Sequence, residues 1–298
     1  MEIKSSLLKY LNNQNWNIGF ANTTPEELVK HKGIGKVEWL KHPYKDRFFA
    51  DPFIYSANNK EIVVFVEELE FSKPVGRLTE LVVDAKSKKL IRKYTLLELD
   101  THLSYPAILR QGNDIFVCPE NGTSGKLSLY KYNSEIHKLE FVSVILEESL
   151  ADATIKQVGD KFYMFATKFP NTQEDLFLYQ SSRFDGMYKE IGLISKGRAN
   201  ARPAGDIFEA EGVLYRPAQN CSKCYGGATE IMQITKCEDG WFEEKHLFSL
   251  LPTSFRYNLG LHTLNFHESI GVIDGYGYLY PIVGRVLHWI RRVVKRIR

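Results

Sequence analysis

Short runs of apolar residues occur in pairs along this chain, and each pair is joined by a tight turn rich in Asn, Gly and Asp. Asn58-Asn59 and Gly112-Asn113 are two such turns. A turn of this kind between two apolar runs is the strongest local signal for a β-hairpin. The first strand of each hairpin opens on a short signature. The five signatures are Ala50–Ile54, Ser104–Ile108, Ala151–Ile155, Ala201–Asp206 and Leu261–Leu264.

The hairpins repeat at a period of about fifty residues. From Asp51 to Tyr105, Asp152, Arg202 and His262 the spacings are 54, 47, 50 and 60 residues. A third strand is predicted after each of the first four hairpins, at Leu78–Val83, Leu127–Tyr132, Leu176–Gln180 and Glu230–Ile234. A fourth is predicted at Leu90–Leu96, Phe141–Leu146, Tyr188–Ile194 and Trp241–Leu247. Four strands per unit at this period are typical of a β-propeller blade.

The fifth unit has only two strands before the pattern changes after Tyr280. Two further strand-like segments, Trp16–Phe20 and Val37–Leu40, lie near the N-terminus. They would complete the fifth blade and close the ring, which removes an exposed sheet edge. We therefore expect an all-β fold, with residues 1–280 forming one five-bladed β-propeller closed by N-terminal strands. A β-sandwich with regularly spaced strands is the alternative.

Residues 281–298 change to a helical pattern. Apolar residues from Ile282 to Ile297 recur at helical spacing, and the other face carries Arg285 and the basic residues after it. A basic amphipathic helix with an interfacial Trp289 is suited to an anionic membrane surface, so we expect residues 282–298 to bind one. The alternatives are a helix docked on the propeller and a helix that binds a partner protein. Nucleic acid is not expected as a partner, because the basic residues are confined to this segment.

Composition adds limits to this picture. The formal net charge of +3 divides into six Lys and Arg at residues 285–298 and 33 against 36 acids elsewhere, or −3. The sequence contains no apolar run long enough for a transmembrane helix and no signal-peptide pattern, so we expect a cytoplasmic, peripheral membrane protein. Cys221 and Cys224 form a lone Cys-x-x-Cys, which we interpret as ordinary loop thiols. We predict no cofactor and no metal site.

The first strand of every blade lines the central channel, so the signatures should meet at one mouth of the channel. The residues expected there are Asp51, Tyr105, Asp152, Arg202, Asp206 and His262, with Glu120 and Arg216 in a second ring. Paired carboxylates such as Asp51 and Asp152 suit glycosyl chemistry. Alternatively, each is a turn residue that bonds nearby backbone.

The basic residues at the mouth favour an anionic substrate. Arg202 and Arg216 could clamp a sugar nucleotide or an acidic sugar, or they could neutralise the aspartates in a structural network. His262 is a candidate proton carrier, although a lone histidine more often has a packing or hydrogen-bonding role. Tyr105 is the candidate sugar-stacking face.

At these positions the chain resembles a known group, the domain at the N-terminus of plant glucosamine inositolphosphorylceramide transferases. The resemblance covers nearly the whole chain to about residue 275. It rests on Asp51-Pro52-Phe53, Ser104-Tyr105-Pro106, Pro119-Glu120, Asp152-Ala153, Arg202-Pro203-Ala204-Gly205, Arg216-Pro217-Ala218-Gln219-Asn220-Cys221, Tyr225-Gly226 and His262-Thr263-Leu264. Similar stand-alone bacterial chains are associated with surface-polysaccharide assembly.

This domain is similar to the five-bladed propellers of arabinanases, xylosidases and invertases, and the resemblance implies catalytic roles for Asp51 and Asp152. Those hydrolases place a general-acid Glu at the opening of a later blade, where this chain has Arg202. Glu120 is the candidate replacement, and ordinary hydrolysis is in doubt. In the plant proteins a separate domain carries the recognised glycosyltransferase fold, so the resemblance leaves the propeller's own role open.

The resulting expectation is an enzyme of surface-polysaccharide or glycolipid biosynthesis. It would transfer a sugar, from a sugar or sugar-nucleotide substrate, to a lipid-linked glycan acceptor at the cytoplasmic membrane face. Asp51 would act as base or as stabiliser of the anomeric centre, Asp152 as orienting carboxylate, and Arg202 with Arg216 as anion clamps. The alternatives are a furanosidase-type glycoside hydrolase with Glu120 as acid, and a non-catalytic glycan-binding propeller.

Overall fold

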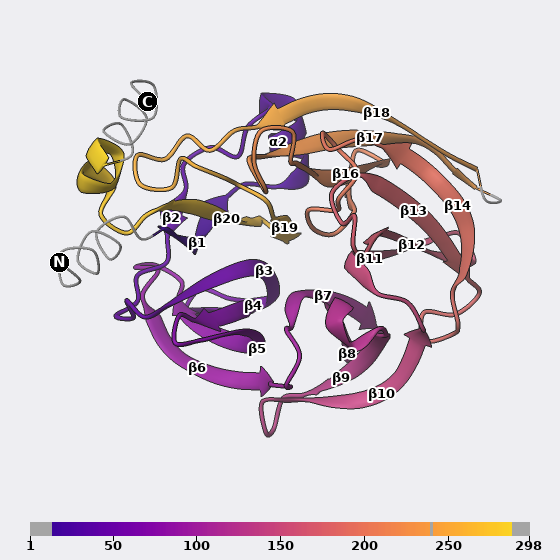
Figure 1. The fold of residues 1–298 in the computed structure, drawn as a ribbon, viewed down its shortest axis with the longest axis horizontal. Helices are drawn as coiled ribbons and strands as arrows, with labels where there is room; N and C mark the ends of the chain where they lie inside the picture. The colour runs from indigo at the N-terminus through magenta and orange to yellow at the C-terminus, as the bar shows by residue number, and fades with distance from the viewer. Residues whose placement is uncertain (1–13, 239–240, 288–298) are drawn as a thin grey trace, which may run out of the picture.

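The computed structural model describes residues 14–238 and 241–287, and these form five four-stranded antiparallel sheets arranged around one axis (Figure 1). Blade one contains β3 (Arg47–Ala57), β4 (Glu61–Glu70), β5 (Lys73–Asp84) and β6 (Leu90–Leu97). Blade two contains β7 (Ser104–Gln111), β8 (Asp114–Glu120), β9 (Leu127–Asn133) and β10 (Lys138–Leu146). Blade three contains β11 (Leu150–Val158), β12 (Lys161–Lys168), β13 (Asp175–Ser181) and β14 (Lys189–Lys196).

The last two blades follow the same plan. Blade four contains β15 (Phe208–Ala210), β16 (Val213–Asn220), β17 (Ala228–Glu238) and β18 (Trp241–Leu250). Blade five has the order β19 (Leu264–His267), β20 (Ile270–Tyr278), β1 (Gln14–Asn22) and β2 (Glu38–Trp39). The five-bladed propeller closed by N-terminal strands is therefore confirmed.

The closure of the ring rests on one long pairing. β1 pairs with β20 along its whole length, from Gln14 opposite Tyr278 to Asn22 opposite Ile270. Ile18 and Phe20 of β1 are buried against Ile54 and Val64 of blade one. The two ends of the chain thus supply one blade and its contact with the next.

Five clusters of buried side chains hold the blades together, and each lies between two neighbouring blades. Alternation along each strand sends successive side chains to opposite faces, so the inner strands of blades one and two each contribute to two clusters. In blade one, for example, Phe53 packs toward blade two and Ile54 toward blade five. The core is therefore distributed around the ring, and the positions nearest the axis can be occupied by polar residues.

The helix α2 (Pro25–His31) between β1 and β2 was not expected from the apolar pattern. Its start is nevertheless encoded locally. The Thr24 side chain accepts a hydrogen bond from the Glu27 backbone, and the Glu27 side chain accepts one from Thr24, which is a capping box. Pro25 supplies a suitable first helical residue. A single 3-10 turn, η1 (Gly122–Ser124), follows β8.

The predicted C-terminal helix is described only in its first part. Residues 281–287 are helical, and residues 288–298 of the prediction lie outside the described residues. Within the described ranges, every helix is too short or too polar to cross a membrane.

The inner strands of blades one, two and three share a β-bulge. The register shifts between Ala50 and Phe53, between Ser104 and Ala107, and between Ala151 and Thr154. At each bulge one non-glycine residue has a left-handed backbone: Asp51 (φ 50°), Tyr105 (φ 45°) and Asp152 (φ 49°). A bulge redirects a side chain, and such backbone strain is concentrated at functional sites. The three positions, which the repeat predicted to be equivalent, therefore share the same bulge and the same backbone conformation.

Candidate active site

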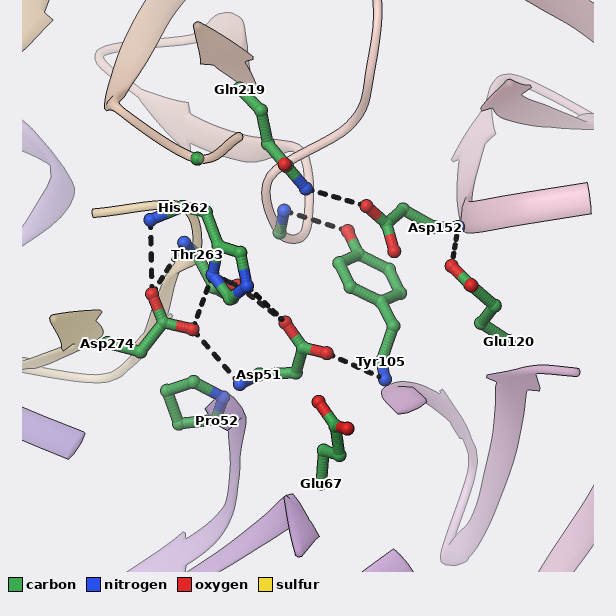
Figure 2. A network of polar contacts seen from close by, with 12 residues as sticks. Asp51, Pro52, Glu67, Tyr105, Glu120, Asp152, Gln219, His262, Thr263 and Asp274 are labelled. Carbon is green, nitrogen blue, oxygen red and sulfur yellow. Dashed lines mark hydrogen bonds and ion pairs between the residues drawn. The ribbon is translucent and has the colours of Figure 1, made fainter. Parts of the chain in front are cut away.

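The three bulges are tied together by carboxylates near the propeller axis (Figure 2). The backbone N–H of Asp51 donates to Asp274 Oδ2 (3.1 Å), and that of Tyr105 donates to Asp51 Oδ2 (3.1 Å). The N–H of Asp152 donates to Glu120 Oε2 (3.0 Å). Each acceptor lies in a neighbouring blade, so the backbone of each strained residue is held by a hydrogen bond to another blade. The acidic side chains converge because the bulges present N–H groups toward the axis.

Asp51 forms the centre of the first cluster. Thr263 Oγ1 donates to Asp51 Oδ1 (2.9 Å), and His262 Nε2 lies 3.7 Å from the same oxygen. On its other side His262 Nδ1 lies 2.6 Å from Asp274 Oδ2. The Trp16 ring stacks on the imidazole at 3.9 Å between centroids. His262 is therefore fixed between two carboxylates and an indole, with little freedom to rotate.

Burial and charge set the protonation of this cluster. Burial raises the pKa of Asp51 to about 7, although the positive charge of His262 works in the opposite direction. Burial alone would lower the pKa of His262, but Asp274 and Asp51 outweigh it and raise that pKa to about 9. At neutral pH the imidazole is therefore protonated while Asp51 titrates. A carboxylate whose pKa lies near the operating pH is suited to general base catalysis.

The raised pKa of His262 predicts a pH-dependent stability. Its contribution to folding is complete below pH 6.5 and is lost as the pH rises toward 9, because the folded state binds the proton more tightly than the unfolded state. We expect the free energy of unfolding to fall by roughly 3 kcal/mol more in the wild type than in His262→Gln over this window. Urea unfolding at several pH values measures it. His31→Gln, on the exposed surface of α2, should follow the wild type; identical profiles for wild type and His262→Gln would contradict the assignment.

Asp51, His262 and Asp274 also offer three potential metal-ligand atoms within 4.8 Å of one another. Carboxylate and imidazole ligands suit several divalent cations. In the described geometry the His262 imidazole lies between the two carboxylates, and its raised pKa favours the protonated form, which offsets part of their charge. A cation would have to displace that proton before it could use all three residues.

Asp152 forms a second cluster, in which Arg202 neutralises it. The Arg202 guanidinium donates to both Asp152 oxygens, through Nε to Oδ2 (2.5 Å) and through Nη2 to Oδ1 (3.2 Å). Its Nη2 also reaches Glu120 Oε2 (3.1 Å), and Gln219 Nε2 donates to Asp152 Oδ2 (2.7 Å). Burial raises the pKa of Glu120 well above its usual range, and the Asp152 charge adds to this. Of the two interpretations of Arg202, the geometry supports the structural network.

Tyr105 lies between the two clusters in Figure 2, and its position differs from the expectation of a sugar-stacking face. The side chain is fully buried, with its ring edge against Phe53. Its hydroxyl accepts the Gly205 N–H (2.7 Å) and lies 2.7 Å from Thr154 Oγ1. Tyr105 therefore bonds the inner parts of blades two, three and four. The exposed aromatic side chain near the site is Tyr225, 42% exposed, with Arg202 above its ring at 5.3 Å.

Two of the predicted residues lie elsewhere. Arg216 is fully buried and directs its guanidinium to Glu244 (2.9 and 2.6 Å) and to the Asn200 carbonyl (2.8 Å), so it is not an anion clamp at the axis. Arg216 was expected in a second ring at the mouth of the channel. Arg216 and Gln219 are three residues apart on β16, so they face opposite sides of the strand, and Gln219 rather than Arg216 reaches the site.

Asp206 belongs to the opposite end of the propeller. It lines a cavity of about 260 Å³ together with Arg110 and Lys156, which are near the ends of β7 and β11 rather than their beginnings. Burial raises the pKa of Asp206 to about 6, while Lys156 and Arg110 act against the rise. The chain passes from the site at Arg202 to this far end within four residues, so sequence proximity was misleading.

The sequence prediction missed four polar residues of the site: Asp274, Thr263, Gln219 and Glu67. Asp274 is an acid that directly follows the apolar run of β20, and it is fully buried. A buried acid in such a strand normally has a specific partner, and this was the available signal. Thr263 and Gln219 stand inside the quoted motifs beside His262 and Arg216. Glu67, on β4, faces Asp51 in Figure 2 and adds negative charge there.

Two solved structures with a similar architecture are a galactosidase and an arabinanase. A GH43 β-1,3-galactosidase has a TM-score of 0.52 at 9% identity, covering 70% of this chain and 81% of its own. An α-L-arabinanase of Cellvibrio cellulosa has a TM-score of 0.50 at 16% identity, covering 66% and 77%. At such low identity these likenesses establish the five-bladed fold alone.

Sequence relatives are more specific. Glucosamine inositolphosphorylceramide transferase 1 of Oryza sativa subsp. japonica is 26% identical over 211 residues, and that of Arabidopsis thaliana is 27% identical over 256. The matches cover 67% and 76% of this chain but 28% and 32% of the relatives, so the chain spans about a third of their length. The family model "Glucosamine inositolphosphorylceramide transferase 1, N-terminal" matches residues 36–274. The chain therefore belongs to the family of the N-terminal domain of glucosamine inositolphosphorylceramide transferase 1.

Proposed function

We propose that this protein transfers a glycosyl group in glycolipid or surface-polysaccharide biosynthesis, from a sugar nucleotide to a lipid-linked acceptor at the cytoplasmic face of a membrane. The relatives are named as transferases, which supports glycosyl transfer as the reaction class. The observation that carries the proposal is the inequality of the two aspartates. Asp152 is paired with Arg202 and accepts a hydrogen bond from Gln219. Asp51 has a pKa raised to about 7, and among the described residues its carboxylate contacts Thr263, His262 and the Tyr105 backbone rather than an arginine or a lysine.

One titrating carboxylate suits a displacement that needs one base. Asp51 would accept the proton of the acceptor hydroxyl while the oxygen of that hydroxyl forms a bond to the anomeric carbon. The bond from that carbon to the phosphate oxygen breaks at the same time, and the nucleoside diphosphate leaves with the electron pair. His262, protonated and held by Asp274, would stabilise the ionised form of Asp51 before proton transfer. The role of Asp152 would be to hold Arg202 and the bulge of blade three.

Glycoside hydrolysis of the furanosidase type is the second candidate. It is supported by the raised pKa of Glu120, because a raised pKa favours the protonated carboxyl group that can donate a proton. It is opposed by the contacts of Glu120, whose Oε2 accepts from Arg202 and from the Asp152 backbone and points into the scaffold. The paired-carboxylate mechanism also needs a second free acid, and Asp152 is engaged.

A product assay separates these functions. The full chain is incubated with radiolabelled sugar nucleotides and a membrane lipid extract, and the products are separated into lipid-soluble and free sugar. Transfer predicts label in the lipid fraction; free sugar released from furanoside substrates, without labelled lipid, would instead establish hydrolysis. Sugar binding with neither product would support a glycan-binding propeller and overturn the proposed transfer.

A further inference from the structure

Two segments of blade five meet at the same end of the propeller as Asp51. Residues 251–261 connect β18 to β19 and enter β19 beside His262. β20 runs antiparallel to β19, from His267 opposite Ile270 to Leu264 opposite Ile273, so the chain leaves β20 at the His262 end. The helical residues 281–287 follow there. Figure 1 shows the β18–β19 connection reaching the helix at the outer edge of the ring.

The two segments contact each other through an arginine and an aromatic ring. The Arg285 guanidinium lies above the Phe255 ring at 4.4 Å and also donates to the Phe255 carbonyl. Two residues further on, Tyr257 accepts a hydrogen bond from Asn17 Nδ2 (2.8 Å), next to the Trp16 that stacks on His262. A continuous set of contacts thus joins these segments to the candidate active site.

The helical residues approach the propeller closely at a glycine, while several of their apolar side chains remain exposed. A Cβ at Gly284 would lie 2.4 Å from the Tyr278 ring, so only glycine permits this close approach. Ile282 is 70% exposed and Val286 is 51% exposed. On the neighbouring connection Leu251 and Phe255 are 63% and 65% exposed. We call Leu251, Phe255, Ile282, Val283 and Val286 the apolar rim.

The charge around the apolar rim has one sign. Residues 245–267 and 275–298 contain no Asp or Glu, while Arg256 and Arg285 flank the exposed apolar side chains. Residues 288–298 of the sequence carry five further Lys and Arg. Exposed aromatic and aliphatic side chains combined with basic ones match the interface of a bilayer that contains anionic lipids.

We propose that the apolar rim inserts into the interfacial layer of an anionic phospholipid bilayer, with Arg256 and Arg285 contacting the headgroups. The contact is made by a folded loop of the propeller as well as by the C-terminal segment. It turns the end of the propeller that carries Asp51 toward the membrane. That orientation toward a lipid-linked acceptor rests on the proposed function, whereas the bilayer contact itself does not.

Vesicle sedimentation tests the proposal. The full chain is mixed with vesicles of phosphatidylcholine plus phosphatidylglycerol, and with vesicles of phosphatidylcholine alone. We expect binding to the anionic vesicles, and we expect Leu251→Asp with Phe255→Asp to lower the partition coefficient by at least about tenfold while the C-terminal segment is intact. Phe141→Asp is the matched control, because Phe141 is 61% exposed on β10 of another blade.

The outcomes are distinguishable. Unchanged vesicle binding in the double variant would overturn the role of the β18–β19 loop. A wild-type dimer that becomes monomeric in the double variant, with no change in vesicle binding, would assign the apolar rim to self-association and overturn the proposal as well. Because sedimentation requires no turnover, it reports on the bilayer contact even if the transferase assay fails.

Discussion

Replacing Asp51 with asparagine is expected to lower the rate of glycosyl transfer by about 10²- to 10⁴-fold, the usual contribution of a general base. Asparagine has nearly the same shape, and its amide oxygen can still accept the Tyr105 N–H. The variant cannot accept the proton of an acceptor hydroxyl. Transfer of label from sugar nucleotides to the lipid extract measures the effect, and the pH profile adds a second readout. Wild-type activity should rise between about pH 6 and pH 8 as Asp51 ionises.

Two further variants make this result specific. Asp160→Asn, in the turn after β11 at the other end of the propeller, should retain the wild-type rate. Asp152→Asn should lower stability more than rate, because the Asp152 carboxylate is the main partner of Arg202. A wild-type rate in Asp51→Asn would remove Asp51 from the mechanism, and equal rate losses in Asp51→Asn and Asp152→Asn would favour the two-carboxylate mechanism.

Replacing Arg202 with methionine is expected to destabilise the fold by about 3–5 kcal/mol, because breaking a buried ion pair leaves uncompensated charge. Arg202 is buried and is the shared donor to Asp152 and Glu120. Methionine keeps much of the apolar stem and removes the guanidinium. Urea unfolding followed by circular dichroism gives the free energy, and a shift in the midpoint at constant slope would indicate a change in stability alone.

A surface ion pair supplies the control for Arg202. Arg92 on β6 pairs with Glu61 at 3.2 Å, and its side chain is half exposed. Arg92→Met should cost less than about 1 kcal/mol, as exposed ion pairs do. If Arg202→Met costs no more than Arg92→Met, the Asp152–Arg202–Glu120 network is not a structural element, and Arg202 returns as a candidate for binding an anionic substrate.

The blade pattern was predictable because every blade solves the same packing problem. The strands of each blade must bury apolar side chains against the neighbouring blades, so the apolar alternation and the turns recur at one period. The two N-terminal strands of blade five were predicted because the fifth unit has only two strands of its own. The helix α2 escaped because it is short and buries mainly Leu28. Its signal was the Thr24–Glu27 capping box, which the apolar pattern does not include.

The site was predictable only where it repeats. Asp51, Tyr105 and Asp152 occupy the same bulge in three blades, so the period located them together. Asp274 and Gln219 have no counterpart at that position, and they reach Asp51 and Asp152, which are 223 and 67 residues away along the chain. Side-chain direction was also beyond the pattern: Arg216 points into the scaffold and Asp206 lies at the far end, because strand register and loop path decide these placements.

The pairing of β1 with β20 has a consequence for synthesis on the ribosome. β1 precedes the strands of blade one along the chain, but its neighbour β20 emerges after about 250 more residues, which at about 5–20 residues per second takes roughly 12 to 50 seconds. During that time Trp16, Ile18 and Phe20 have no β20 to cover them, and an uncovered apolar strand invites pairing with other chains. The nascent chain therefore passes through a long interval in which chaperone protection of β1 matters most.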